Sequence, residues 1–236
     1  FVASGNTDIH PNRWYHITCT YSNSAGGKMY INSSDYGGVG KTFTFSGDAS
    51  DSTNAPWINT TNITIGTVNN NATYAIDGKV SNVQIWNKKL SDADAVTLWN
   101  NGQPLMTGTQ PQAANLKAWY KLNQSANWNG SNWAISDSTA NYTKVLSRIA
   151  SYNTVTSAGS ADGVNCGNDS SLQITGSMSI SLWFRVNTIS PLHSWNFVMG
   201  RSRYRTEAAA DAVWNLLLKG VSYGNPAFFQ FRLSDG

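Results

Sequence analysis

Cysteine, glutamate and charge of either sign are scarce in this chain of 236 residues. Its two cysteines, Cys19 and Cys166, are too few for a disulfide framework or a zinc cluster. Twelve of the thirteen acidic residues are aspartate, and Glu207 is the single glutamate. Charged residues make up 12% of the chain and its net charge is +3, a balance too weak to predict a nucleic-acid partner. No apolar run reaches the length of about 18 residues that a membrane helix needs, so we expect no membrane insertion.

Short segments in which apolar and polar residues alternate dominate what is present. Alternation with a period of two, rich in β-branched and aromatic residues, predicts strands. We expect strands at residues 13–21, 28–32, 41–45, 62–68, 80–87, 116–122, 143–146, 163–166, 171–174, 177–186, 197–205, 213–219 and 227–233. Asn, Ser, Thr and Gly fill the stretches between them, as is typical of turns and loops, and residues 123–141 are predicted as a loop. Many short strands of this kind indicate an all-β sandwich or jelly roll.

A short helix is expected after residues 80–87. Ser91 can accept a hydrogen bond from a free backbone N–H of the first turn, and Asp94 places a carboxylate at the positive end of the helix. Val96 and Trp99 belong to an apolar stripe on the same stretch. Gly102 can adopt the left-handed conformation that ends a helix. A helix of two to three turns is marginal in water, so its apolar side chains should pack on a larger surface.

The motifs resemble those of a known family, with two parts in exchanged order. Four segments resemble the second half of a laminin-G-like, concanavalin A-like lectin/glucanase domain: RWYHITCTY, KMYIN, ITIG and the stretch from YAIDG to LWNNG. Four later segments resemble the first half of the same domain: LKAWYKLNQS, NWAISDSTAN, GVNCGNDSSLQI and MSISLWFRV. The resemblance implies an all-β fold, a two-sheet antiparallel jelly-roll sandwich with one short helix.

The exchanged order divides the chain at a segment without periodicity. Residues 1–102 correspond to the C-terminal half of the domain, residues 103–115 to a linker, and residues 116–236 to the N-terminal half. Two arrangements fit: the halves close into one sandwich within the chain, or they are parts of two consecutive repeats that other copies complete. We favour closure within the chain, because the family's opening and closing strands are neighbours. That arrangement would place residues 116–122 beside residues 80–87.

Hydrolysis of carbohydrate is not expected. The resemblance implies that a glucanase of this superfamily would use two glutamates about 5 Å apart, whereas this chain has Glu207 alone. Asp92 and Asp94 lie in the first turn of the expected helix, where their charge favours the helix N-terminus. We therefore predict that the protein is not an enzyme.

A calcium ion at the rim of the sandwich is implied by the resemblance, with oxygen atoms of Asp, Asn and the backbone as ligands. Asp137 and Asn141, in the segment DSTAN, match a loop of the family, and Asp77 precedes a strand that the fold would bring close. The alternative is that these aspartates only form turns, because aspartate bonds readily to its own backbone. Ca²⁺ held by Asp77, Asp137 and Asn141 is the cofactor prediction.

Carbohydrate recognition requires exposed aromatic faces and planar polar groups. Trp128 and Trp133, in a loop rich in Asn, are the candidate aromatic contacts, and the alternative is that they pack over the core. Arg201, Arg203 and Arg205 alternate with other residues, so in a strand their guanidinium groups line one face. Such a face suits an anionic polysaccharide, and the alternative is a solvated strand face.

Two functions of different class follow. The first is a non-catalytic, lectin-like module for carbohydrate binding and adhesion in a secreted or virion-surface repeat protein, with a glycan or anionic polysaccharide as partner. The second is a structural assembly repeat of a fibre, capsid decoration or filament, with other copies of the same protein as partners. The tryptophans and arginines favour the first, and the way FRLSDG would run into FVASG favours the second. Both place the protein outside the cell or on a virion surface.

Overall fold

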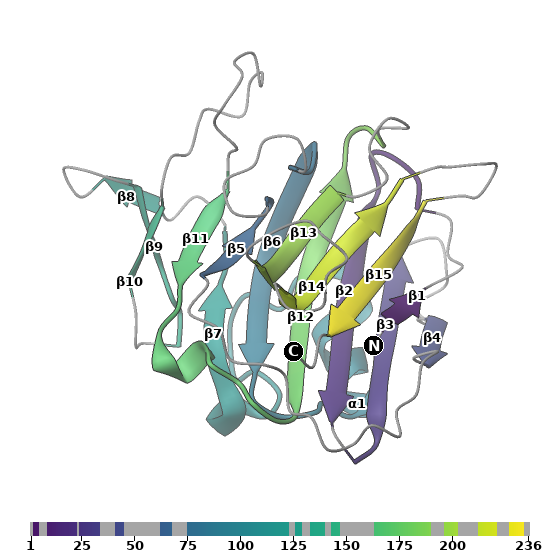
Figure 1. Cartoon of the computed structure of the whole chain (residues 1–236), viewed down its shortest axis with the longest axis horizontal. Helices are drawn as coiled ribbons and strands as arrows, with labels where there is room; N and C mark the ends of the chain where they lie inside the picture. Colours follow the sequence, from purple (N-terminus) through teal and green to yellow (C-terminus); the bar gives the residue numbers. More distant parts are fainter. Residues whose placement is uncertain are drawn as a thin grey trace.

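The computed structural model describes residues 2–4, 9–22, 24–33, 41–44, 62–67, 75–122, 126–128, 133–139, 143–146, 163–189, 196–202, 212–220 and 227–233. These residues form two large sheets that face each other, a smaller sheet at one side, and a short helix (Figure 1). Among them, no helix has the length and apolar character needed to cross a membrane. The predicted fold, an all-β jelly-roll sandwich with one short helix, is confirmed.

The first large sheet, which we call the β2 sheet, has the strand order β4-β3-β2-β12-β6-β7, with every neighbouring pair antiparallel. Its strands are β2 (Trp14–Ser22), β3 (Gly26–Ser33), β4 (Lys41–Thr44), β6 (Gly78–Trp86), β7 (Leu116–Tyr120) and β12 (Met178–Val186). The second, which we call the β14 sheet, has the order β1-β15-β14-β13-β5-β11 and is also antiparallel. Its strands are β1 (Val2–Ser4), β5 (Ile63–Ile65), β11 (Val164–Gly167), β13 (Asn196–Ser202), β14 (Ala212–Lys219) and β15 (Phe228–Leu233).

Two predictions about local structure are wrong. The span 123–141, predicted as a loop, contains β8 (Ala126–Trp128) and β9 (Trp133–Ser136), which pair with each other and with β10 (Thr143–Leu146) in a small sheet beside β11 (Figure 1). The strand expected at 171–174 is instead the 3₁₀ turn η5 (Ser170–Leu172). Its first turn is capped by Asp169, whose carboxylate accepts from the Ser171 backbone N–H at 2.9 Å, and this local bond favours a turn over a strand.

Strands from the two parts of the chain alternate within both large sheets. In the β2 sheet, β12 lies between β2 and β6, and β7 pairs with β6 through Gln84 and Trp119. In the β14 sheet, β5 lies between β13 and β11. The predicted neighbourhood of residues 116–122 and 80–87 is therefore confirmed. The assignment of residues 1–102 and 116–236 to two halves of one family domain stays a prediction.

The core lies between the two large sheets. Alternate residues of each strand point into it, among them Ile17 of β2 and Leu182 of β12 from one side and Leu216 of β14 from the other. Phe184 and Phe229, from opposite sheets, meet edge to face with 5.2 Å between ring centroids. The cysteines Cys19 and Cys166 are buried in the same core as free thiols. Burial in this apolar interior raises the pKa of the Cys19 thiol.

Helix α1 (Asp92–Trp99) begins as the sequence predicts and is followed by the 3₁₀ turn η3 (Asn100–Gly102), in which Gly102 has the expected left-handed φ, 84°. The Ser91 hydroxyl accepts from the Asp94 backbone N–H at 3.1 Å, and the Asp94 carboxylate accepts from the Ser91 backbone N–H at 2.9 Å, a reciprocal capping box. Asn100, with φ 45°, already adopts the left-handed conformation that ends the helix. Asparagine tolerates this conformation better than most residues with a side chain, which is why glycine is not needed at that point.

Candidate functional site

The outward face of the β2 sheet, which points away from the core, carries unusually polar and aromatic side chains. Tyr15 and Ile17 of β2 belong to the core, so Trp14, His16 and Thr18 point outward. The chain covers parts of this face with its own residues. Helix α1 lies over one part through Trp99, and residues 103–115, which we call the strap, lie over another part.

The strap is fixed to the sheet by hydrogen bonds. The indole N–H of Trp86 donates to the Pro111 carbonyl at 2.9 Å, and the Gln84 side-chain amide donates to Gln110 Oε1 at 3.1 Å. Gln110 is itself 4% exposed. The residues predicted as a linker do connect the two parts of the chain, and they are also packed against β6.

Trp14, Arg185 and Lys79 form a row across three strands at the end of the outward face that the strap and α1 leave uncovered. Arg185 of β12 is the direct cross-strand partner of Trp14 in β2 and of Lys79 in β6. Its neighbours Phe184 and Val186 belong to the core, so Arg185 points outward. The Trp14 side chain is 38% exposed, Lys79 is exposed and Arg185 is half-buried. We call these three residues the open row.

Aromatic rings lie next to the open row on the same face of the sheet. Trp183, two residues before Arg185, is stacked by Trp99 from the end of α1, with 5.3 Å between ring centroids and 15° between planes. His16 lies 5.2 Å from Trp183 by the same measure. The His16 Nε2 is 2.8 Å from the Ser181 hydroxyl, and burial lowers the pKa of His16 to about 3. The His16 ring is therefore neutral at physiological pH.

Asn12 holds the guanidinium of Arg185. One of its terminal nitrogens, Nη2, donates to Asn12 Oδ1 at 2.9 Å. Asn12 has the left-handed φ of 65° and is tied to the end of β12, because its backbone N–H donates to the Val186 carbonyl. The contact fixes the position of Arg185 without adding a negative charge beside it.

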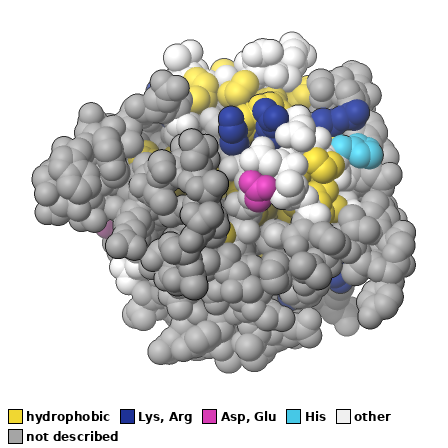
Figure 2. Space-filling view, turned by 90° about the horizontal axis from the view of Figure 1, so that it is seen from above, with side chains coloured by type: hydrophobic (Ala, Val, Ile, Leu, Met, Phe, Trp, Pro, Cys, Tyr) yellow, Lys and Arg dark blue, Asp and Glu magenta, His cyan; other side chains and the backbone are white. Residues whose placement is uncertain are grey.

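Basic side chains gather at this end of the β2 sheet. Figure 2 shows Lys and Arg side chains close together among hydrophobic ones, with an acidic side chain nearby. Besides the open row, Lys121 follows β7 on the outward face, with its ammonium 4.6 Å from the centre of the Trp119 ring. Asp77 precedes β6, and its carboxylate accepts from Asn187 Nδ2 at 3.0 Å and from the Thr188 hydroxyl. Among the described residues, Asp77 is the one acidic side chain beside the open row, and its carboxylate is hydrogen-bonded to the segment that follows β12.

A comparison with known families agrees with this architecture. Residues 1–96 match the family model described as the concanavalin A-like lectin/glucanases superfamily. Over these residues the chain is similar to that superfamily. The match includes Trp14 and Lys79 and, within the sandwich, both strands that flank β12. No curated protein and no solved structure matches the chain.

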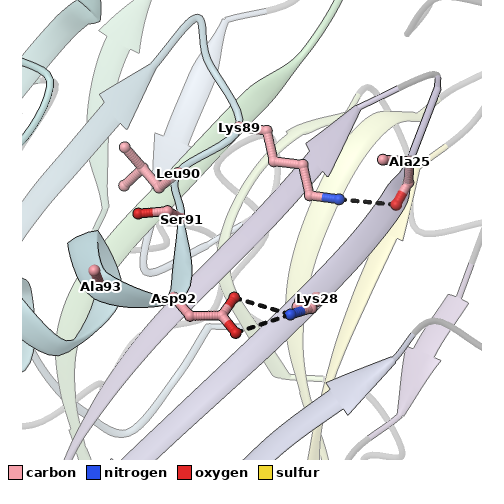
Figure 3. Close-up of a pocket in the computed structure, with 7 residues that line it drawn as sticks. All are labelled: Ala25, Lys28, Lys89, Leu90, Ser91, Asp92 and Ala93. Carbon is pink, nitrogen blue, oxygen red and sulfur yellow. Dashed lines mark hydrogen bonds and ion pairs between the residues drawn. The ribbon is translucent and has the colours of Figure 1, made fainter.

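This concanavalin A-like sandwich has a second feature on its surface, an open hollow of about 530 Å³ between the β2–β3 turn and the start of α1 (Figure 3). Its charged groups bind one another: Lys28 Nζ lies 2.8 Å from the nearer Asp92 carboxylate oxygen, and the Tyr30 hydroxyl donates to Asp92 at 2.6 Å. Lys89 Nζ donates to the Ala25 carbonyl at 2.8 Å. Hydrogen bonds from Lys28 and Tyr30 lower the pKa of Asp92. These contacts hold α1 against the β2–β3 hairpin. We assign no ligand to the hollow.

The structure does not bring together Asp77 and Asp137, two of the three predicted calcium ligands. Asp77 directly precedes β6, whereas Asp137 contacts Trp119, the cross-strand partner of Gln84 near the far end of β6. Strand residues advance by about 3.3 Å each, so the two aspartates are roughly 20 Å apart. Asn141 lies outside the described residues, and no group of three or more His, Cys, Asp or Glu within them could hold a metal ion. The described residues do not place Asp77 beside Asp137, and the calcium site predicted for Asp77, Asp137 and Asn141 stays a prediction.

Asp137 instead closes a turn and anchors it to β7, which is the alternative considered from the sequence. Its Oδ1 accepts from the backbone N–H of Trp119 at 2.9 Å, from that of Thr139 at 2.9 Å and from the Thr139 hydroxyl at 2.8 Å. These three hydrogen bonds satisfy one of the two carboxylate oxygens of Asp137.

The sugar-contact residues predicted from the sequence do not form the open row. Trp128 and Trp133 are direct cross-strand partners in the β8–β9 hairpin, and the structure describes their backbone alone. Arg201 is 1% exposed, and its Nη1 donates to the Leu172 carbonyl at 3.1 Å. Its guanidinium therefore lies inside the protein, and its predicted place on an exposed arginine face is wrong. Arg203 and Arg205 lie outside the described residues.

Strand alternation in the sequence already marks two residues of the open row. Trp14 stands on the opposite side of β2 from Tyr15, and Arg185 is the one charged residue of the longest apolar strand. Both belong to the outward face by alternation alone. What the sequence could not show is the register that sets Arg185 between Trp14 and Lys79.

Proposed function

We propose that this chain is a non-catalytic, lectin-like module that binds carbohydrate through the open row. The observation that supports the proposal most directly is the exposed indole of Trp14 on a sheet face, beside the guanidinium of Arg185. An indole face packs well on the apolar face of a sugar ring, and guanidinium and ammonium groups donate hydrogen bonds to sugar hydroxyls. The open row supplies both kinds of contact on three neighbouring strands, with β12 in the middle.

Rigid support strengthens the case for binding. All three residues of the open row lie on strands, Asn12 fixes the Arg185 guanidinium, and the stacked Trp183 and Trp99 lie next to the row on the same face of the sheet. Side chains that are already held in place lose less conformational entropy when a ligand binds. A weak ligand such as a short glycan benefits most from this.

The proposal is for binding without hydrolysis. Retaining hydrolysis of a glycosidic bond needs two carboxyl groups about 5 Å apart, and in the glucanases of this superfamily these are glutamates. Glu207 is the one glutamate of the sequence, so such a pair cannot form. As a glycan-binding module, the protein would act in a secreted or virion-surface setting.

Assembly into a fibre or filament is the weaker candidate. Such assembly through sheet edges is favoured by long unpaired edge strands. The edge strands of the two large sheets, β1, β4, β7 and β11, have between three and five residues. Strands from both parts of the chain also complete each other's sheets, which leaves no large edge among the described strands for another copy to fill.

A glycan array tests the proposal, followed by titration of each hit against wild type and two variants. Trp14→Ala removes the exposed indole of the open row. Val96→Ala is the matched control, because Val96 is the other large exposed hydrophobic residue described and lies on α1. We expect wild type and Val96→Ala to bind alike and Trp14→Ala to bind at least about tenfold more weakly. Binding to no glycan, or equal binding by Trp14→Ala, would overturn the proposal.

A further inference from the structure

The open row has a local charge balance that differs from that of the whole chain. The chain carries a net charge of only +3, yet the open row combines Lys79 and Arg185, with Lys121 on the same face. The described aspartates other than Asp77 lie at α1 or beside β7 and η5, away from the row. Asp77 is held by Asn187 and Thr188. A ligand on this surface therefore meets a field of positive sign.

Arg185 is hydrogen-bonded to a neutral side chain, so its positive charge is not neutralised by that contact. It is half-buried, its Nε has no hydrogen-bond partner within the described part of the chain, and its one side-chain contact there is with Asn12. The partner oxygen of Asn12 belongs to a neutral amide. The Nε is buried, so a ligand would meet the terminal nitrogens of the guanidinium, which carry four of its five N–H donors. Partial burial of a cation without an anion is unfavourable, and an anion supplied by a ligand would relieve it.

The presence of asparagine, and not aspartate, at position 12 determines the charge beside Arg185. Aspartate would have a similar size, would tolerate the same left-handed φ of 65° and would offer an oxygen at the same place. It would also neutralise Arg185. The contact with Asn12 thus orients the guanidinium and keeps its full charge available, which is the arrangement expected of a receptor for an anion.

We propose that the ligand of the open row is an acidic saccharide, whose carboxylate or sulfate group binds Arg185 while the adjoining sugar ring packs on Trp14. Asn12 acts as a positioning residue for that anion contact, and Lys79 adds a second positive charge on the far side of Arg185. This inference rests on the proposed carbohydrate-binding function and names the class of sugar that it concerns. Carboxylate and sulfate groups each offer a pair of oxygens that can accept from the two arms of a guanidinium fork, so both sources are compared in the test.

Isothermal titration with three oligosaccharides of equal length provides the test: one neutral, one containing a uronic acid, and one carrying sulfate. Wild type should bind at least one acidic form about tenfold more tightly than the neutral form at low ionic strength. Asn12→Asp should reduce that ratio to about one, because the new carboxylate neutralises Arg185 and weakens the binding of the acidic forms. Lys88→Gln is the control, since it removes one exposed cation beyond the opposite end of β6 from Lys79 and should preserve the ratio.

The outcomes separate this inference from the proposed function. If none of the three oligosaccharides and no glycan of the array binds, the proposed function fails and the inference fails with it. Equal binding of neutral and acidic forms would overturn the inference alone, as would an unchanged ratio in folded Asn12→Asp. Circular dichroism establishes whether that variant is folded. Arg185→Lys keeps the charge but removes the fork, so it should reduce the ratio several-fold, and an unchanged ratio would also overturn the inference.

Discussion

The indole of Trp99, the last residue of α1, stacks on the indole of Trp183 in β12, with 5.3 Å between their centroids and 15° between their planes. The two rings come from the two parts of the chain and are both almost fully buried. Their contact covers the outward face of the β2 sheet next to the open row. The helix is short, so its position depends on this contact and on the apolar side chains of the same turn.

Removing the Trp99 ring should destabilise the protein. We expect Trp99→Ala to lower the free energy of unfolding by about 3–5 kcal/mol, because a large buried aromatic side chain is lost and a cavity remains. Urea denaturation followed by far-UV circular dichroism measures the change. Val96→Ala on the same helix should stay within about 0.5 kcal/mol of wild type, because Val96 is exposed. A loss below about 1 kcal/mol for Trp99→Ala would show that the stack is not important for stability.

The stability of the fold should depend on pH through His16. The folded-state pKa of His16 is about 3, below its ordinary value of 6.5, so the unfolded chain takes up the proton first as the pH falls. The contribution of neutral His16 is therefore complete above about pH 6.5 and is lost as the pH falls from there toward 3. The expected slope in the free energy of unfolding approaches about 1.4 kcal/mol per pH unit between about pH 6 and pH 4.5.

Urea denaturation at intervals across that range measures the slope, and His16→Gln is the comparison variant. Glutamine can bond to Ser181 but does not titrate, so the slope between pH 6 and pH 4.5 should become shallower by most of this amount. The same slope in wild type and His16→Gln would contradict a buried, neutral His16.

Metal removal should have no effect on glycan binding. The open row consists of an indole, a guanidinium and an ammonium, none of which is a ligand for Ca²⁺. Titration of an array hit in EDTA should give the same dissociation constant as titration in calcium. A loss of binding in EDTA that added Ca²⁺ restores would move the site away from the open row.

The closure of the sheets within one chain can be tested by circular permutation. Val2 of β1 and Arg232 of β15 are cross-strand partners, so the beginning and the end of the chain lie in neighbouring strands. Joining Gly236 to Phe1 and opening the chain between Thr107 and Gly108, which are exposed in the strap, should give a folded monomer. Size-exclusion chromatography and thermal unfolding would check this. An unfolded permutant, or one that is stable only as a dimer, would contradict closure within the chain.

The sequence predicts local features well and cross-strand features poorly. The alternation in β2 separates Tyr15 from Trp14 correctly, and Ser91 with Asp94 marks the start of α1, because each depends on residues close in the chain. The open row depends on the pairing of Arg185 with both Trp14 and Lys79. That register spans more than a hundred residues and is set by the packing of the whole sandwich.

The positions of Arg201 and of the two aspartates depend on contacts between distant parts of the chain. Arg201 alternates as an exposed strand residue would, but which face of a strand is buried depends on the opposite sheet, and here the guanidinium meets the Leu172 carbonyl in the interior. The family's rim aspartates were expected to converge. Asp77 and Asp137 lie at opposite ends of β6 because the pairing of β6 with β7 places Trp119 beside Gln84.

Mapping of NMR chemical-shift changes during titration with a glycan that binds tests the central claim most directly, since it locates the ligand without a substitution. We expect the largest shifts at the Trp14 indole N–H and at backbone amides of residues 12–16, 79–81 and 183–186, with small shifts in the β8–β9 hairpin. Shifts confined to that hairpin, around Trp128 and Trp133, would contradict binding at the open row.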